Sequence, residues 1–84
     1  MSYSTYVLYS SKYNEIYIGH SRDVEKRLVE HNEGKSSSTK RYIPWQLIHR
    51  EEFATRSQAM KREKELKSQK GREWIRKEIL KKHL

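Results

Sequence analysis

The chain of 84 residues is long enough for one small domain, and only 33% of its residues are hydrophobic, so its core is small. It has no cysteine, which excludes a disulfide framework and a thiolate metal site. No apolar run approaches the roughly 20 residues of a membrane-spanning helix, so we expect a cytoplasmic protein with no membrane partner. The net charge is +8, and residues 55–84 hold 11 basic against 4 acidic residues. This excess predicts a polyanionic partner, although a solvated helical surface is the alternative.

The first part of the chain predicts a β-hairpin followed by a helix. Residues 5–10 and 16–19 are rich in β-forming side chains and are separated by a polar turn, which indicates two paired strands. Ser21 is a candidate cap for a helix over residues 23–32. Gly34 follows that stretch and is expected to end the helix.

The second part predicts a third strand and two more helices. Residues 45–53 follow a proline and read as a strand. A capping box that begins at Thr55 opens a helix over 57–69, and Gly71 is expected to separate it from a last helix over 72–82. The order ββαβαα predicts one α/β domain of the α+β kind over residues 1–84. Its small three-stranded antiparallel sheet is flanked by three helices.

Two of these helices carry ionisable residues on the face that their apolar residues mark. Val24 and Leu28 define a face of the first helix that also holds Arg27 and His31, and Glu63 lies on the apolar face of the second. Such groups are costly to bury unless they are paired, hydrogen-bonded or bound to metal. Arginine binds phosphate, histidine carries protons and glutamate binds hard metal ions. The combination predicts a site for phosphodiester chemistry.

The motifs resemble a known family when their order and spacing are taken together. Tyr17-Ile18-Gly19 resembles the second half of the GIY-YIG signature, and Ser4-Thr5-Tyr6 stands where the first half would be, with only the tyrosine kept. The further pieces are Asp23-x-x-x-Arg27-Leu28-x-x-His31-Asn32-x-Gly34, Pro44-Trp45-x-Leu47-Ile48, Glu52-Phe53 and Ala59-x-Lys61-Arg62-Glu63-x-x-x-Lys67. Together they resemble the small stand-alone bacterial branch of the GIY-YIG nuclease superfamily, whose module is also found in excision-repair nucleases.

The resemblance implies a metal-dependent endonuclease and assigns roles to single residues. Tyr17 would be the general base or would orient the attacking water, and Tyr6 would position that phenol. Arg27 would hold the scissile phosphate, with His31 as an accessory catalytic residue. Glu63 would bind a single Mg²⁺ or Mn²⁺ ion, weakly in the absence of substrate because Mg²⁺ keeps most of its water.

A nucleic-acid surface is expected beside this site. His20 directly follows Gly19, where repair-nuclease members carry lysine. The candidate nucleic-acid-binding residues are His20, Lys35, Lys40, Arg41, Lys61 and Lys67. DNA is favoured over RNA. A protein partner is a candidate source of target selection, because so small a domain offers little surface for it.

Each of these assignments has a structural alternative. Arg27 can pair with an acidic residue on its own helix, Glu63 can pair with Lys67 one turn later, and His31 can be a hydrogen-bonded core histidine. The basic loop over residues 35–41 either moves freely in solvent or grips phosphate. For the whole chain, the alternatives to an enzyme are a catalytically inactive nucleic-acid-binding module and a protein-interaction domain.

Overall fold

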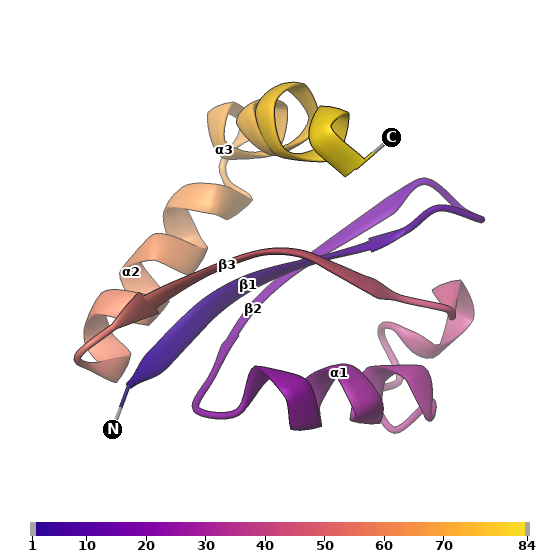
Figure 1. Ribbon diagram of the computed structural model, residues 1–84, viewed down its shortest axis with the longest axis horizontal. Coiled ribbons are helices and arrows are strands. Elements are labelled where there is room, and N and C mark those ends of the chain that lie inside the picture. The colour runs from indigo at the N-terminus through magenta and orange to yellow at the C-terminus, as the bar shows by residue number, and fades with distance from the viewer. Residues whose placement is uncertain (1, 84) are drawn as a thin grey trace.

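The computed structural model describes residues 2–83 and contains one antiparallel sheet of three strands. The strands are β1 (Tyr3–Ser10), β2 (Glu15–Ser21) and β3 (Gln46–Phe53), and β1 lies between the other two (Figure 1). The predicted strands are confirmed, and β1 and β2 both run beyond their predicted bounds. Because β1 is central, β2 and β3 form the two edges of the sheet.

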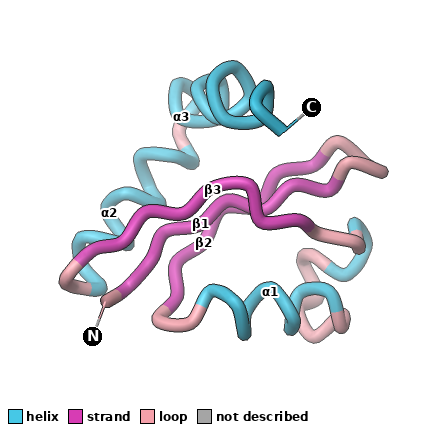
Figure 2. Tube along the Cα trace, in the orientation of Figure 1, coloured by secondary structure: helices cyan, strands magenta, loops and turns pink. Residues whose placement is uncertain are grey.

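Helices cover both faces of this sheet, as Figure 2 shows. On one side lies α1 (Val24–Asn32), and on the other lie α2 (Arg56–Lys67) and α3 (Gln69–Trp74). A π-helical turn, η2 (Ile75–Ile79), and a 3₁₀ turn, η3 (Leu80–His83), continue α3 to the end of the described chain. A further 3₁₀ turn, η1 (Lys40–Tyr42), lies in the loop before β3. The predicted order ββαβαα is therefore confirmed. No helix in the part of the chain that the structure describes is long and apolar enough to span a membrane.

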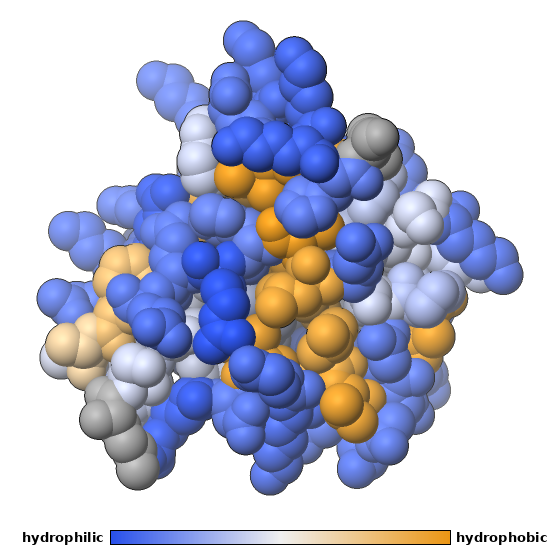
Figure 3. All heavy atoms as spheres, viewed as in Figure 1, coloured by the Kyte–Doolittle hydropathy of each residue, from blue (hydrophilic) through white to orange (hydrophobic). Residues whose placement is uncertain are grey.

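The alternation of side chains along β1 divides the core into two clusters. Tyr6 and Leu8 face α1, and the intervening Val7 faces α2 and α3. The cluster on the α1 side comprises Tyr6, Leu8, Val24 and Trp45, and the cluster on the other side comprises Val7, Tyr9, Ile18, Ile48, Leu66, Ile75, Ile79 and Leu80. Hydrophilic side chains cover most of the face seen in Figure 3, and a strip of hydrophobic side chains crosses its middle.

The start of α1 differs from the prediction, and its end confirms the prediction. Asp23 is the N-cap, since its carboxylate accepts a hydrogen bond from the Lys26 amide. The Ser21 hydroxyl instead accepts a hydrogen bond from the Asp23 amide. The assignment of the cap to Ser21 was therefore wrong, because Ser21 is still the last residue of β2 and the helix begins at Val24. Gly34 has a φ of +79° and its amide bonds the carbonyl of His31, which ends the helix as expected.

The join between α2 and α3 also differs from the prediction. The capping box of Thr55 and Gln58 is present and opens α2. The break, however, lies at Ser68, whose backbone is extended and whose hydroxyl accepts a hydrogen bond from the Gly71 amide. Gly71 is inside α3, so the expectation that it separates the helices was wrong. A Cβ at Gly71 would lie 2.3 Å from the Glu65 carbonyl oxygen, so this glycine serves close helix packing.

Candidate active site at the edge of the sheet

Two tyrosines from neighbouring strands meet over Gly19 on the α1 side of the sheet. Tyr6 in β1 lies opposite Gly19 in β2, and Leu8 lies opposite Tyr17. A Cβ at Gly19 would stand 2.9 Å from the Tyr6 hydroxyl and 3.0 Å from the Tyr17 ring. The ring centroids of the two tyrosines are 6.2 Å apart. The glycine of the signature thus leaves room for both phenols over the edge strand.

His31 is fully buried behind these tyrosines. Its Nε2 lies 3.2 Å from the Tyr6 hydroxyl and its Nδ1 lies 2.8 Å from the hydroxyl of Thr39. Burial, reinforced by the charge of Arg27, lowers the pKa of His31. A neutral ring satisfies both contacts if Nδ1 donates to Thr39 and Nε2 accepts from Tyr6. His31 therefore holds the Tyr6 phenol in place and lies out of reach of solvent.

Arg27 lies on α1 beside the Tyr6 hydroxyl. Its side chain is 37% exposed, and its Nη1 donates a hydrogen bond of 2.8 Å to Glu30. This carboxylate raises the pKa of Arg27 above its usual value. The pairing of Arg27 with Glu30 that the sequence left open is thus present. It orients a guanidinium group that still has donors available to a ligand.

Glu63 reaches the same edge of the sheet from α2, on the opposite face. Its two carboxylate oxygens accept hydrogen bonds from His20 Nδ1 at 2.6 Å and from Lys67 Nζ at 2.7 Å, and its side chain is 18% exposed. Burial alone would raise the pKa of Glu63, but the hydrogen bonds from Lys67 and His20 outweigh it and hold that pKa below its usual value. Glu63 is therefore an ionised, largely buried carboxylate whose two oxygens both accept hydrogen bonds.

The electrostatics of Tyr6 link the two faces of the sheet. Burial raises the pKa of Tyr6 to about 12, with further contributions from Tyr17 and from the negative charge of Glu63, and Arg27 opposes the rise. Both charged groups are thus within electrostatic range of the Tyr6 hydroxyl. In addition, His20 and Arg27 line one open groove at the end of β2. His20 also contacts Glu63, so residues of β2, α1 and α2 lie near this end of β2.

The structure separates the six predicted nucleic-acid-binding residues. His20 is directed at Glu63, and Lys67 at the same carboxylate. Lys61 lies elsewhere, in a hollow lined by Phe53 and Arg62. The loop residues Lys35, Lys40 and Arg41 are exposed, with Lys35 paired to Glu33 and Arg41 stacked on Tyr42.

Comparison with known proteins decides the family of this chain. Residues 2–78 match the model of the GIY-YIG catalytic domain. The chain belongs to the GIY-YIG family. The match takes in both tyrosines, Arg27, His31 and Glu63.

Relatives of similar size share much of the sequence. A UPF0213 protein of Staphylococcus saprophyticus is 43% identical over 58 residues, which cover 68% of this chain and 71% of that protein. A UPF0213 protein of Bacillus velezensis is 39% identical over 66 residues, covering 74% and 67% of the two chains. The solution NMR structure of the UPF0213 protein BH0048 from Bacillus halodurans has a TM-score of 0.53 at 29% identity and covers 89% of this chain and 82% of its own. Within the GIY-YIG family, the chain thus belongs with the UPF0213 proteins.

The donor set at Glu63 fits a weakly held divalent ion. No cluster of three or more potential metal-binding side chains occurs within residues 2–83, so an all-protein cage is absent from this part of the chain. Mg²⁺ is commonly held by one or two carboxylates together with water and substrate phosphate. An ion at Glu63 would share the carboxylate with His20 and displace Lys67, whose side chain is 47% exposed.

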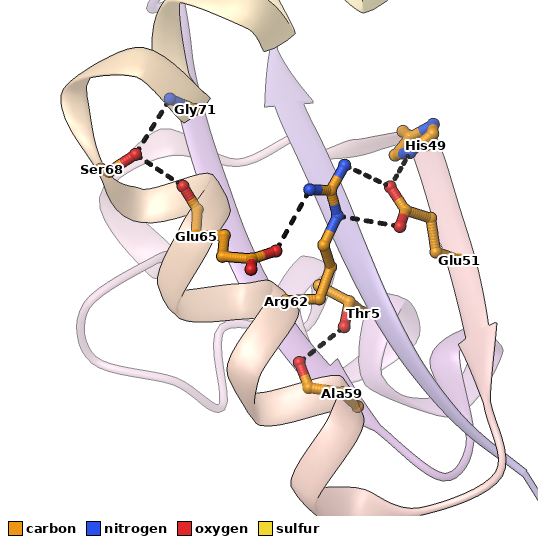
Figure 4. Close-up of polar contacts among 8 residues, drawn as sticks. All are labelled: Thr5, His49, Glu51, Ala59, Arg62, Glu65, Ser68 and Gly71. Carbon is orange, nitrogen blue, oxygen red and sulfur yellow. Dashed lines mark hydrogen bonds and ion pairs between the residues drawn. The ribbon is translucent and has the colours of Figure 1, made fainter.

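Several contacts beside the site escaped the sequence analysis. Thr39, whose hydroxyl contacts His31, belongs to no motif. It lies in a loop eight residues after His31, and the fold of this loop brings the two side chains together. Arg62 is next to Glu63 in the sequence, yet it points to β3, where it binds Glu51 through two hydrogen bonds of 2.9 and 3.1 Å (Figure 4). His49 also contacts Glu51 at 2.7 Å. Arg62 and Glu63 thus lie on the same face of the sheet but reach its two opposite edge strands, β3 and β2.

Proposed function

We propose that this chain is a metal-dependent endonuclease that hydrolyses phosphodiester bonds, with DNA favoured over RNA as substrate. The observations that support it are the packing of Tyr6 and Tyr17 over Gly19, the place of Arg27 and His20 on one groove, and the contact of His20 with Glu63. A phenol, a guanidinium group and a carboxylate there offer proton transfer, phosphate binding and metal binding within one electrostatic neighbourhood. The family supports the assignment, because its model describes a catalytic domain.

The two tyrosines take different roles in this proposal. Tyr6 has a pKa of about 12 and its hydroxyl is engaged by His31, so it stays protonated and positions its neighbour. Tyr17 is half-buried, and its hydroxyl has no hydrogen-bond partner among residues 2–83. Its hydroxyl is thus open to an attacking water, which Tyr17 orients or deprotonates. His31 acts through Tyr6 and is a positioning residue.

Arg27 and Glu63 act on the phosphate in this account. Arg27 keeps donors that can bind the phosphoryl oxygens and stabilise the charge that develops on them. Glu63 is the ligand of the divalent ion, and His20 orients its carboxylate. The ion, when bound, supplies Lewis-acid stabilisation of the leaving oxygen.

A second candidate function is a nucleic-acid-binding module that does not cut. It is favoured by the contacts of Glu63, whose two oxygens already accept hydrogen bonds from His20 and Lys67. In that case the carboxylate only neutralises its basic neighbours. A protein partner for target selection and a cytoplasmic location stay predictions under both functions.

A cleavage assay separates these functions. Labelled branched, flapped and single-stranded DNA and RNA are incubated with the wild-type protein and Mg²⁺ or Mn²⁺. Glu63→Gln tests the metal ligand, and Glu65→Gln makes the same charge change two residues later on α2. We expect wild type and Glu65→Gln to cut at similar rates. Glu63→Gln should bind substrate without cutting, because it loses a ligand that acts in the transition state.

Two results would contradict the proposal. Cleavage by Glu63→Gln at the wild-type rate, with contaminating nuclease excluded, would remove Glu63 as metal ligand. Binding without any cleavage by the wild type on all substrates would establish the module that does not cut.

A further inference from the structure

The groove at the end of β2 shares Arg27 and His20 with the candidate active site and is otherwise lined by other residues. It encloses about 370 Å³, which is within the roughly 300–1,000 Å³ typical of ligand sites. Besides His20 and Arg27, its lining includes Tyr3, Arg22, Lys26 and Arg56. None of these last four belongs to the catalytic assignments above, so the groove holds a second set of cations.

Tyr3 organises two of these cations. The guanidinium carbon of Arg22 lies 5.7 Å from the centroid of the Tyr3 ring, and that of Arg56 lies 5.6 Å from it. Both distances are in the range of cation–π contacts. A single half-buried ring at the start of β1 thus contacts an arginine from the β2–α1 turn and one from the first turn of α2, and both arginines line the groove.

The charge of this groove is only partly neutralised. Its acidic residues are Asp23, which caps α1, and Glu30, which is bound to Arg27. Lys26 and Arg56 form no ion pair within residues 2–83, and both are exposed. Two arginines that contact one ring and line one groove with a lysine suit a phosphate group, which guanidinium groups bind in a forked geometry.

We propose that Arg56 and Arg22, held by Tyr3, bind a backbone phosphate of the same nucleic-acid strand whose scissile phosphate lies at Arg27. This inference rests on the proposed function, because it takes Arg27 as the scissile-phosphate ligand. The shared groove makes the two phosphate positions continuous. The subsite does not discriminate between base sequences, because contacts to phosphates position the protein on the strand and carry no sequence information.

The test measures binding of a labelled DNA duplex by fluorescence anisotropy over a range of salt concentrations. Arg56→Gln removes one subsite cation, and Lys77→Gln removes an exposed cation of η2 as the matched control. Cleavage with Mg²⁺ is measured on the same proteins, and circular dichroism confirms their folding. We expect Arg56→Gln to weaken binding on the order of tenfold, the effect of losing one charged hydrogen bond. The slope of log K against log salt should become shallower by about 0.9. Lys77→Gln should change binding less than twofold, within the order of a surface substitution.

The outcomes separate this inference from the proposed function. Equal binding by Arg56→Gln and Lys77→Gln, with cleavage by the wild type intact, would overturn the subsite and leave the nuclease in place. Weaker binding by Arg56→Gln alone, with no cleavage by any protein, would support the subsite and reject the nuclease. Tyr3→Leu gives a second reading, because loss of the ring should weaken binding in the same direction while both charges remain.

Discussion

At the scale of single residues, the two phenols of the candidate site differ in their surroundings. Tyr6 is buried, its pKa is raised to about 12, and its hydroxyl contacts His31. Tyr17 is half-buried beside it. The His31 ring lies 4.7 Å from the Tyr17 ring and so packs against both. A buried histidine with two satisfied nitrogens thus makes the geometry of the phenols depend on one protonation state.

His31 gives a prediction on the pH dependence of stability. The groups that face it are Tyr6, Thr39, Tyr17 and Arg27, and burial together with Arg27 lowers its pKa in the folded state. An unfolded histidine titrates near pH 6.5, so the unfolded chain takes up the proton first as the pH falls. The free energy of unfolding should therefore decrease as the pH falls from about 6.5 towards the folded-state pKa.

Chemical denaturation of wild type and His31→Gln at several pH values between about 5 and 7 checks this. We expect His31→Gln to cost about 1–3 kcal/mol at pH 7, because Tyr6 and Thr39 lose a buried partner. Its stability should also depend less on pH than that of the wild type. His83→Gln is the exposed control, and equal pH slopes for wild type and His31→Gln would refute the assignment.

The sequence could identify the charged residues of the site but not their partners. Helical periodicity placed Arg27, His31 and Glu63 toward the interior, because an amphipathic face is set by local spacing alone. It could not show that His20 turns to Glu63, since this contact joins residues 43 positions apart. Which face of the sheet each side chain occupies depends on the pairing register of the strands, and local sequence does not fix it.

At the scale of elements, the C-terminal helices owe their arrangement to Ser68 and Gly71. Ser68 ends α2 and caps α3, and the extended backbone at Ser68 turns the chain. Gly71 then lets α3 approach the last turn of α2, where a side chain would meet the backbone of Glu65 and Leu66. Arg76, in η2, donates hydrogen bonds to the side chain and the carbonyl of Asn14 in the hairpin turn. These contacts fix α3 and η2 over the sheet.

Gly71→Ala tests the close helix contact. Its Cβ would lie 2.3 Å from the Glu65 carbonyl oxygen and 2.6 Å from the Leu66 Cα, and both are backbone atoms that cannot rotate away. We expect a loss of about 1–3 kcal/mol in the free energy of unfolding, measured by urea denaturation. The matched control is Lys70→Ala, at an exposed position of the same helix, which should stay within about 0.5 kcal/mol of the wild type. A Gly71→Ala protein as stable as this control would show that the helices can separate without cost.

At the scale of the whole molecule, the small sheet leaves β2 as an edge where two helical layers meet. Arg27 comes from one layer and Glu63 from the other, and both phenols lie over Gly19 on the α1 side of the sheet. The fold class was predictable because the strands, caps and apolar faces are local signals. The arrangement of the candidate site on both faces of the sheet was not predictable, because it depends on how the two helical layers pack against the sheet beside the edge strand β2.

NMR line broadening by Mn²⁺ tests the two-sided site most directly. The paramagnetic ion is titrated into ¹⁵N-labelled protein, and broadening is compared between wild type, Glu63→Gln and Glu65→Gln. Because a carboxylate is the expected ligand, broadening in the wild type and Glu65→Gln should start at Gly19, His20 and residue 63 and reach Tyr17 and Arg27. In Glu63→Gln this pattern should disappear. Broadening that persists in Glu63→Gln, or that spares Tyr17 and Arg27 while Glu63 broadens, would contradict a single site assembled across the edge of β2.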